Sequence, residues 1–250
     1  MKLTVHESAE AMGKAAVETA ARILREAIAR KGQAAFIAAT GASQFGFLAN
    51  LVAAPGITWE RTSMFHLDEY IGFSADHPAS FRRYLRQRLT SRVPIGTVNF
   101  IEGDAANIQK ELERLNRLLT ATPIDVAFVG IGENGHLAFN DPPADFDVET
   151  PYIIVTLDEA CRRQQFGEGW FKSLQDVPKR AISMSVRQIM KSAHIICTVP
   201  DRRKAQAAKA CLEGEIGPRV PASILRRHPQ CFLFLDREAA SLLASSTLSA

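Results

Sequence analysis

The sequence lacks the features that mark membrane, secreted and disulfide-rich proteins. No apolar run approaches the roughly 18 residues of a membrane-spanning helix, and the first ten residues lack the apolar core and cleavage site of a signal peptide. The four cysteines, Cys161, Cys197, Cys211 and Cys231, form no C-x-x-C pair and no metal-ligand spacing. We therefore expect a cytoplasmic protein with reduced thiols and no membrane partner.

A large charge of either sign is also missing. The 30 Lys and Arg residues against 27 Asp and Glu give a formal net charge of +3, and the basic residues are scattered, so no nucleic-acid partner is expected. No repeat, low-complexity segment or Ser/Gly linker interrupts the chain, so residues 1–250 are predicted to form a single domain. No Walker loop, dinucleotide loop, nucleophile elbow or zinc motif is present, and we expect neither metal nor organic cofactor.

What the sequence does contain is a regular alternation of short apolar runs and amphipathic stretches. The apolar runs are 34–39, 63–68, 98–102, 124–130, 152–157, 181–186, 194–199 and 231–235, and the helical patterns are 9–29, 44–52, 77–89, 105–119, 203–212 and 238–243. Near-continuous apolar runs are typical of strands buried on both faces of a parallel sheet. The pattern predicts an α/β fold with one doubly wound, mostly parallel sheet and helices on both faces, Rossmann-like in class.

Ligands of such sheets bind beyond the carboxyl ends of the strands, so the residues after each apolar run are the candidates for a site. The first such place is A-A-T-G-A-S, where Thr40, Gly41, Ala42 and Ser43 lead from a strand into a helix. Small residues let backbone N–H groups approach an anion at a helix N-terminus. The alternative is an ordinary turn with Ser43 as the N-cap.

A second strand end carries two adjacent carboxylates in M-F-H-L-D-E-Y, where Asp68 and Glu69 follow an apolar run directly. A carboxylate here is a candidate general base, particularly if burial raises its pKa. In the alternative reading, Asp68 caps the next turn and Glu69 is solvated. His66, within the same apolar run, is expected to be a core histidine.

The third strand end is glycine-rich, V-G-I-G-E-N-G-H-L-A-F-N-D-P-P. Asn134, Gly135 and His136 lie on the turn, and Asp141 follows closely. An imidazole with a carboxylate nearby suits proton transfer near neutral pH. The irregular stretch 140–150 is expected to be a functional loop or lid.

A further strand end, P-D-R-R-K-A-Q-A, places Arg202, Arg203 and Lys204 after the run 194–199. A cation here could hold a phosphate, although a solvated first helical turn explains the same residues. His228, in R-R-H-P, is expected on a surface turn.

Together T-G-A-S, L-D-E-Y-I-G and G-I-G-E-N-G-H-L-A-F-N-D-P resemble the glucosamine-6-phosphate deaminase family, which shares a superfamily with 6-phosphogluconolactonases. The resemblance runs in order from about residue 9 to 243. It implies metal-free conversion of glucosamine-6-phosphate and water to fructose-6-phosphate and ammonia. It also implies that Asp68 moves a proton from carbon 2 to carbon 1, that His136 opens the sugar ring, and that Asp141 and Asn134 surround the histidine.

The same resemblance implies a phosphate cradle made by the backbone of residues 41–43 and by Lys204. Thr40, Glu69 and Gly135 are counted with the substrate-binding residues. The stretch 161–171 stands where the family usually has a phosphate-binding arginine, and Arg162 or Arg163 is the candidate replacement. Because Asn134 and Asp141 also depart from the family pattern, a related amino-sugar or ketose phosphate stays open as the substrate.

Two other functions compete with the deaminase. A 6-phosphogluconolactonase would use the histidine as the base for water attack on a lactone. A non-catalytic sugar-phosphate sensor would carry a helix-turn-helix segment, for which the stretch before residue 34 leaves no room, and would tend to lose Asp68 or His136. The expected partner is a small-molecule sugar phosphate, and a homo-oligomer is possible.

Overall fold

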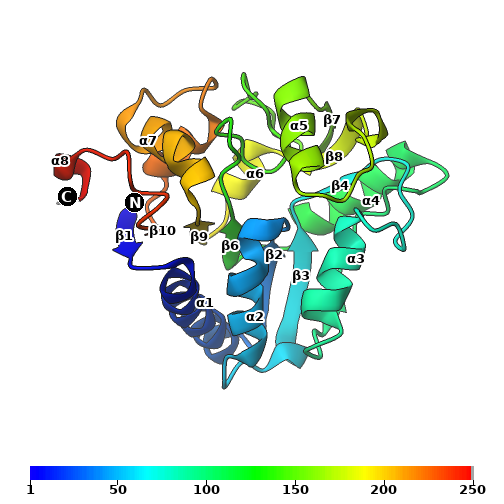
Figure 1. The fold of residues 1–250 in the computed structure, drawn as a ribbon. Coiled ribbons are helices and arrows are strands. Elements are labelled where there is room, and N and C mark those ends of the chain that lie inside the picture. The colour runs from blue at the N-terminus through cyan, green and yellow to red at the C-terminus, as the bar shows by residue number, and fades with distance from the viewer. Residues whose placement is uncertain (249–250) are drawn as a thin grey trace.

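A computed structural model describes residues 1–248 and has a parallel seven-stranded sheet at its centre (Figure 1). The strands, in spatial order, are β1 (Lys2–His6), β10 (Cys231–Asp236), β9 (His194–Val199), β6 (Val126–Val129), β2 (Ala34–Ala38), β3 (Thr62–His66) and β5 (Thr97–Val98). Every neighbouring pair is parallel. This confirms the predicted fold class.

Helices cover both faces of this sheet. The longer ones are α1 (Ala9–Lys31), α2 (Phe45–Ala53), α4 (Ile108–Thr120) and α7 (Ala205–Glu213). Along β2, Phe36 packs with α1 and α2, whereas Ile37 packs with α4 on the other face, because successive side chains of a strand point to opposite sides. Burial on both faces explains why the runs are apolar without alternation.

The remaining helical segments are short. They are α3 (Phe81–Leu85), α5 (Glu159–Gly167), α6 (Val186–Met190) and α8 (Ser245–Leu248), with η1 (Ala42–Gln44), η2 (Trp59–Arg61), η3 (Arg86–Thr90), η4 (Leu174–Asp176), η5 (Arg202–Lys204) and η6 (Pro221–Arg227). The predicted helix 77–89 is thus only partly formed, beginning at Phe81 after its N-cap Ser80. Of residues 1–248, no helix has both the length and the apolar character to cross a bilayer.

The prediction of a single sheet was wrong in one respect, because the structure contains a second, antiparallel sheet. Its strands are β4 (Asp68–Tyr70), β8 (Arg180–Met184) and β7 (Tyr152–Thr156). In Figure 1 it lies with α5 beyond the end toward which the β3 arrow points. The chain leaves β3 through Leu67, whose carbonyl accepts from the Met184 N–H, and enters the second sheet at once. The predicted strands 152–157 and 181–186 belong here.

Three smaller expectations also need correction. The edge strand β1 was not predicted, and the predicted helix 238–243 is a series of turns. His228 is buried rather than on a surface turn, with its Nε2 2.8 Å from the carbonyl oxygen of Ser192. His66 is buried as predicted, and its Nε2 accepts from the Ile101 N–H. Burial lowers the pKa of His66 to about 3, so its imidazole is neutral.

Candidate active site

A cleft with a cavity of about 320 Å³ opens at the carboxyl ends of the central strands, the edge of the sheet at which the sequence predicts a site. Each of these strand ends contributes lining residues: 39–43 after β2, 67–68 after β3, 130–133 and 136 after β6, and 200, 201, 203 and 204 after β9. The end of α5 supplies Gln164, Gln165 and Glu168. A cleft of this size, built from several strand ends, suits a small polar ligand.

Asp68 is the first residue of β4 and lines this cleft, although only 6% of its surface is exposed. Burial raises the pKa of its carboxyl well above the usual range, and the neighbouring carboxylates Glu69 and Glu168 raise it further. A carboxylate with a raised pKa holds an accepted proton more firmly. Asp68 can therefore act as a general base toward a ligand in the cleft.

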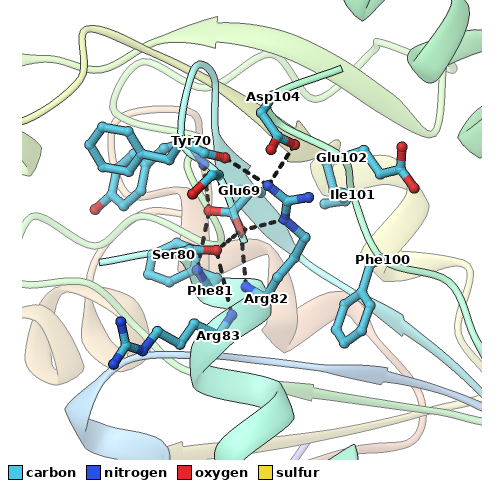
Figure 2. Close-up of polar contacts among 12 residues, drawn as sticks. Glu69, Tyr70, Ser80, Phe81, Arg82, Arg83, Phe100, Ile101, Glu102 and Asp104 are labelled. Atoms are coloured by element: carbon cyan, nitrogen blue, oxygen red, sulfur yellow. Dashed lines mark hydrogen bonds and ion pairs between the residues drawn. The ribbon is translucent and has the colours of Figure 1, made fainter. Parts of the chain in front are cut away.

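Glu69 points away from the cleft and does not line it, which corrects its prediction as a substrate-binding residue. Figure 2 shows its carboxylate surrounded by the start of α3. It accepts hydrogen bonds at 2.8–3.1 Å from the Ser80 hydroxyl and from the backbone N–H groups of Tyr70, Phe81 and Arg82. Successive side chains of a strand alternate, so only one of two adjacent carboxylates reaches the ligand.

The side chain of Arg82 completes this buried cluster. Its Nη2 lies 2.8 Å from Asp104 Oδ1 and its Nε 3.5 Å from Glu69 Oε2 (Figure 2). Burial raises the pKa of Glu69, and its hydrogen bonds oppose that rise. Because all of its partners are donors, the carboxylate is held as an anion that ties β4 to α3. The cluster fixes the strand that carries Asp68.

His136 faces the cleft with a carboxylate behind it. Its Nδ1 lies 3.1 Å from Asp141 Oδ1, and Asn134 donates to the same oxygen at 3.2 Å while accepting from the His136 N–H at 3.1 Å. Burial alone would raise the pKa of Asp141, but the hydrogen bond and charge of His136 outweigh burial and lower it. Asp141 is thus an anion that orients the imidazole, a pairing that suits a proton-transferring histidine.

The loop around the histidine depends on two glycines. A Cβ on Gly132 would lie 2.2 Å from His136 Nε2, so the imidazole can pack there only against glycine. Gly135 has a φ of 84°, in the left-handed region, and its carbonyl accepts from the Ala222 N–H. Gly135 does not line the cleft, so its prediction as a substrate-binding residue is corrected to a loop-shaping role.

The segment 140–150 is irregular, as expected, but it is not a lid. It supplies Asp141 from behind the histidine, and its residues do not line the cleft. The cleft is lined instead by residues of α5 and the residue after it, within the stretch 161–171 for which the resemblance implied phosphate binding through Arg162 or Arg163.

The turn 40–43 and the segment after β9, which contains Lys204, line the same cleft. Thr40, Gly41, Ala42 and Ser43 all line it, and the Tyr84 hydroxyl donates to the Gly41 carbonyl at 2.9 Å. Lys204 is buried, which lowers its pKa, while the carboxylates of Glu133 and Glu168 act in the opposite direction. A turn of small residues in the same cleft as a lysine is a suitable site for a phosphate group.

The two arginines expected to replace a phosphate-binding residue do not reach the cleft. Arg162 donates to the carbonyls of Leu174 at 2.7 Å and Val177 at 3.0 Å, and Arg163 pairs with Glu159 on the exposed face of α5. Gln164 and Glu168, one helical turn apart, line the cleft instead. The spacing of four residues puts Gln164 and Glu168 on the same face of a helix, and this pattern in the sequence could have indicated that they act together.

One group within residues 1–248 has the ligand types of a metal site, namely His136, Asp141 and Cys161, whose donor atoms lie within 4.8 Å of one another. The histidine and aspartate are already hydrogen-bonded to each other. Burial raises the pKa of the Cys161 thiol, and nearby Asp141 raises it further. A protonated thiol is a poor metal ligand, so the arrangement favours a hydrogen-bonded dyad.

The chain is similar to known proteins over almost its whole length. The model of the family described as glucosamine-6-phosphate isomerases/6-phosphogluconolactonase matches residues 7–233. A glucosamine-6-phosphate deaminase of Lactobacillus delbrueckii subsp. bulgaricus is 33% identical, covering 97% of this chain and 100% of the relative. The corresponding protein of Streptococcus sanguinis is 34% identical, covering 97% and 99%.

Solved structures are similar as well. One, described as a monomeric glucosamine-6-phosphate deaminase, has a TM-score of 0.88 and 30% identity, covering 97% of this chain and 100% of that one. A 6-phosphogluconolactonase from Trypanosoma brucei has a TM-score of 0.80 at 18% identity, covering 97% and 98%, and is similar in fold alone.

Proposed function

Because the chain belongs to the family of glucosamine-6-phosphate isomerases and 6-phosphogluconolactonases, we propose that it is a glucosamine-6-phosphate deaminase. The reaction would convert glucosamine-6-phosphate and water to fructose-6-phosphate and ammonia. The observation that carries the proposal is the buried Asp68 carboxylate facing the same cleft as the His136–Asp141 pair. Removal of a proton from carbon 2 needs such a base, whereas lactone hydrolysis does not.

In this reaction the phosphate binds between the turn 40–43 and Lys204, and this remote binding energy positions the sugar. His136 then moves a proton between the anomeric hydroxyl and the ring oxygen, which opens the ring. Asp141 keeps the imidazole oriented because it accepts from Nδ1, so the other nitrogen is free to transfer the proton.

Asp68 removes the proton from carbon 2 of the open-chain amino aldehyde and returns it to carbon 1. A proton also passes from the nitrogen to oxygen 1, so the product is a 2-imino sugar with a hydroxymethyl carbon 1. Water adds to the imine carbon, the C–N bond breaks and ammonia leaves, which gives the ketose phosphate. Burial of Asp68 supports the role because a raised pKa brings its basicity closer to that needed near neutral pH.

We further propose a single-domain cytoplasmic enzyme that needs neither metal nor organic cofactor. Four buried cysteines without disulfides are compatible with a reducing compartment. The related structure described as monomeric supports a monomer over a homo-oligomer.

The test is ammonia release across a panel of phosphorylated amino sugars, with fructose-6-phosphate formation measured in parallel. Glucosamine-6-phosphate should give both products in equal amounts. Hydrolysis of 6-phosphogluconolactone without ammonia release from any amino sugar would show that the proposal is wrong.

A further inference from the structure

Glu168 places a carboxylate inside the cleft, over the turn 40–43. It is the residue directly after α5, and its two carboxylate oxygens lie 3.7 and 3.9 Å from the position of a Cβ on Gly41. Gln164, one helical turn before Glu168, also lines the cleft, and its side-chain oxygen accepts from the Glu133 N–H at 2.9 Å. Glu168 is therefore held where an incoming phosphate would bind.

The positive groups that act electrostatically on Glu168 are the same groups that a bound phosphate would attract. Burial raises the pKa of Glu168, and the charges of Lys204, Arg203 and His136 oppose the rise in that order. Arg203 is already paired with Asp201, with 2.8 Å between its Nη2 and Oδ2. Lys204 is thus the main cation for two anions, Glu168 and the ligand phosphate.

The cleft as a whole carries more acidic than basic groups. Its lining includes the carboxylates of Asp68, Glu133, Glu168, Asp201 and Asp236, against the cations Arg203 and Lys204 and the imidazole of His136. A ligand that brings only a phosphate adds negative charge to this set. A ligand that also brings an ammonium group restores the balance.

We propose that Glu168 is a specificity-determining residue for substrates that carry both a phosphate and an ammonium group. The phosphate binds Lys204, and the ammonium group of the substrate supplies a positive partner for the Glu168 carboxylate in the same cleft. This inference rests on the proposed function, in which the amino group is on carbon 2.

The position of Asp68 supports this pairing of the ammonium group with Glu168. Asp68 must approach carbon 2, and its carboxyl is one on which Glu168 acts electrostatically. Asp68 and Glu168 line the same cleft, so an amino group on carbon 2 beside Asp68 lies in the cleft that Glu168 also lines. A phosphate sugar without an amino group would bring negative charge into the cleft beside Glu168 and no positive charge to balance it, so repulsion would select against it.

The experiment compares two unreactive ligands that differ in one group. They are 2-amino-2-deoxyglucitol-6-phosphate and glucitol-6-phosphate, and their Kd values are measured by calorimetry at pH 7. In the unaltered protein the amino ligand should bind more tightly. Glu168→Gln removes the charge and keeps the shape, so the Kd ratio of the two ligands should fall by about tenfold, with glucitol-6-phosphate binding more tightly than before.

Glu133→Gln is the matched control. Glu133 also lines the cleft and lies 3.9 Å from Arg203 Nη1. Its removal should change both Kd values in the same direction and keep their ratio within about threefold. Glu168→Ser repeats the test with a shorter neutral side chain, and circular dichroism with a melting curve checks that every variant is folded.

A Kd ratio that is unchanged in both folded Glu168 variants overturns the proposal, because Glu168 then acts on the phosphate alone. The outcome is separate from that of the proposed function. If the unaltered protein releases ammonia while the ratio stays unchanged in the variants, this inference alone fails. If the protein releases no ammonia from any amino sugar, the proposed function fails first.

Discussion

Replacement of the buried base is the most direct perturbation of the proposed mechanism. Asp68→Asn keeps the size of a side chain that is 6% exposed, and the β4 pairing with β8 uses only backbone groups. The fold should therefore survive. A positioned general base contributes about 10²–10⁴-fold to a rate, so kcat should fall at least ~100-fold. KM should change little, because the phosphate binds at the turn 40–43 and Lys204.

The assay is ammonia release, with exchange of the carbon-2 proton followed in deuterated buffer, and both should fall together. The unaltered enzyme adds a check on pH. Because burial raises the pKa of Asp68, the base form and hence kcat/KM should be lost as pH falls through a value well above the ordinary range for Asp. Near-normal turnover in Asp68→Asn, or an acidic limb at the ordinary pKa of an aspartate, would refute this reasoning.

Three further outcomes are expected. His136→Gln should slow turnover of closed-ring substrate strongly but spare carbon-2 exchange in an open-chain phosphate; equal losses would contradict a ring-opening role. Glu69→Ala should lower the free energy of unfolding in urea by about 3–5 kcal/mol, because it leaves Arg82 and other donors buried without their partner, whereas exposed Arg163→Ala should change it by under ~0.5 kcal/mol. EDTA should leave activity unchanged. Loss of activity in EDTA and its recovery on addition of a divalent cation would count against a metal-free reaction.

The sequence by itself determined the type of fold and the edge of the sheet at which a site could form. Apolar runs without alternation indicate strands covered on both faces, and parallel strands bring their carboxyl ends together. This is why Asp68, His136 and Lys204, far apart in the chain, could be assigned to one cleft. The residues after each strand could be assigned to this edge of the sheet without knowing the order of the strands.

Tertiary structure decided which neighbour of a pair faces the ligand and which strands share a sheet. In β4 the register with β8 sets Asp68 opposite Ser183 and Glu69 opposite Ile182, so one carboxylate reaches the cleft and the other is buried against α3. The sequence Asp68–Glu69 by itself does not show which of the two side chains faces the cleft. The runs 152–157 and 181–186 are as apolar as the strands of the main sheet. Local hydrophobicity shows that a strand is buried but does not show which strand it pairs with.

The same limit applies to α5. Arg162 and Arg163 were the obvious cations in the sequence, yet the docking of the helix turns them to backbone carbonyls and solvent and turns Gln164 and Glu168 to the cleft. Which stripe of a short polar helix faces inward depends on contacts made by residues distant in the chain. A helix without a strong apolar face does not encode that choice locally, and only the packed structure supplies it.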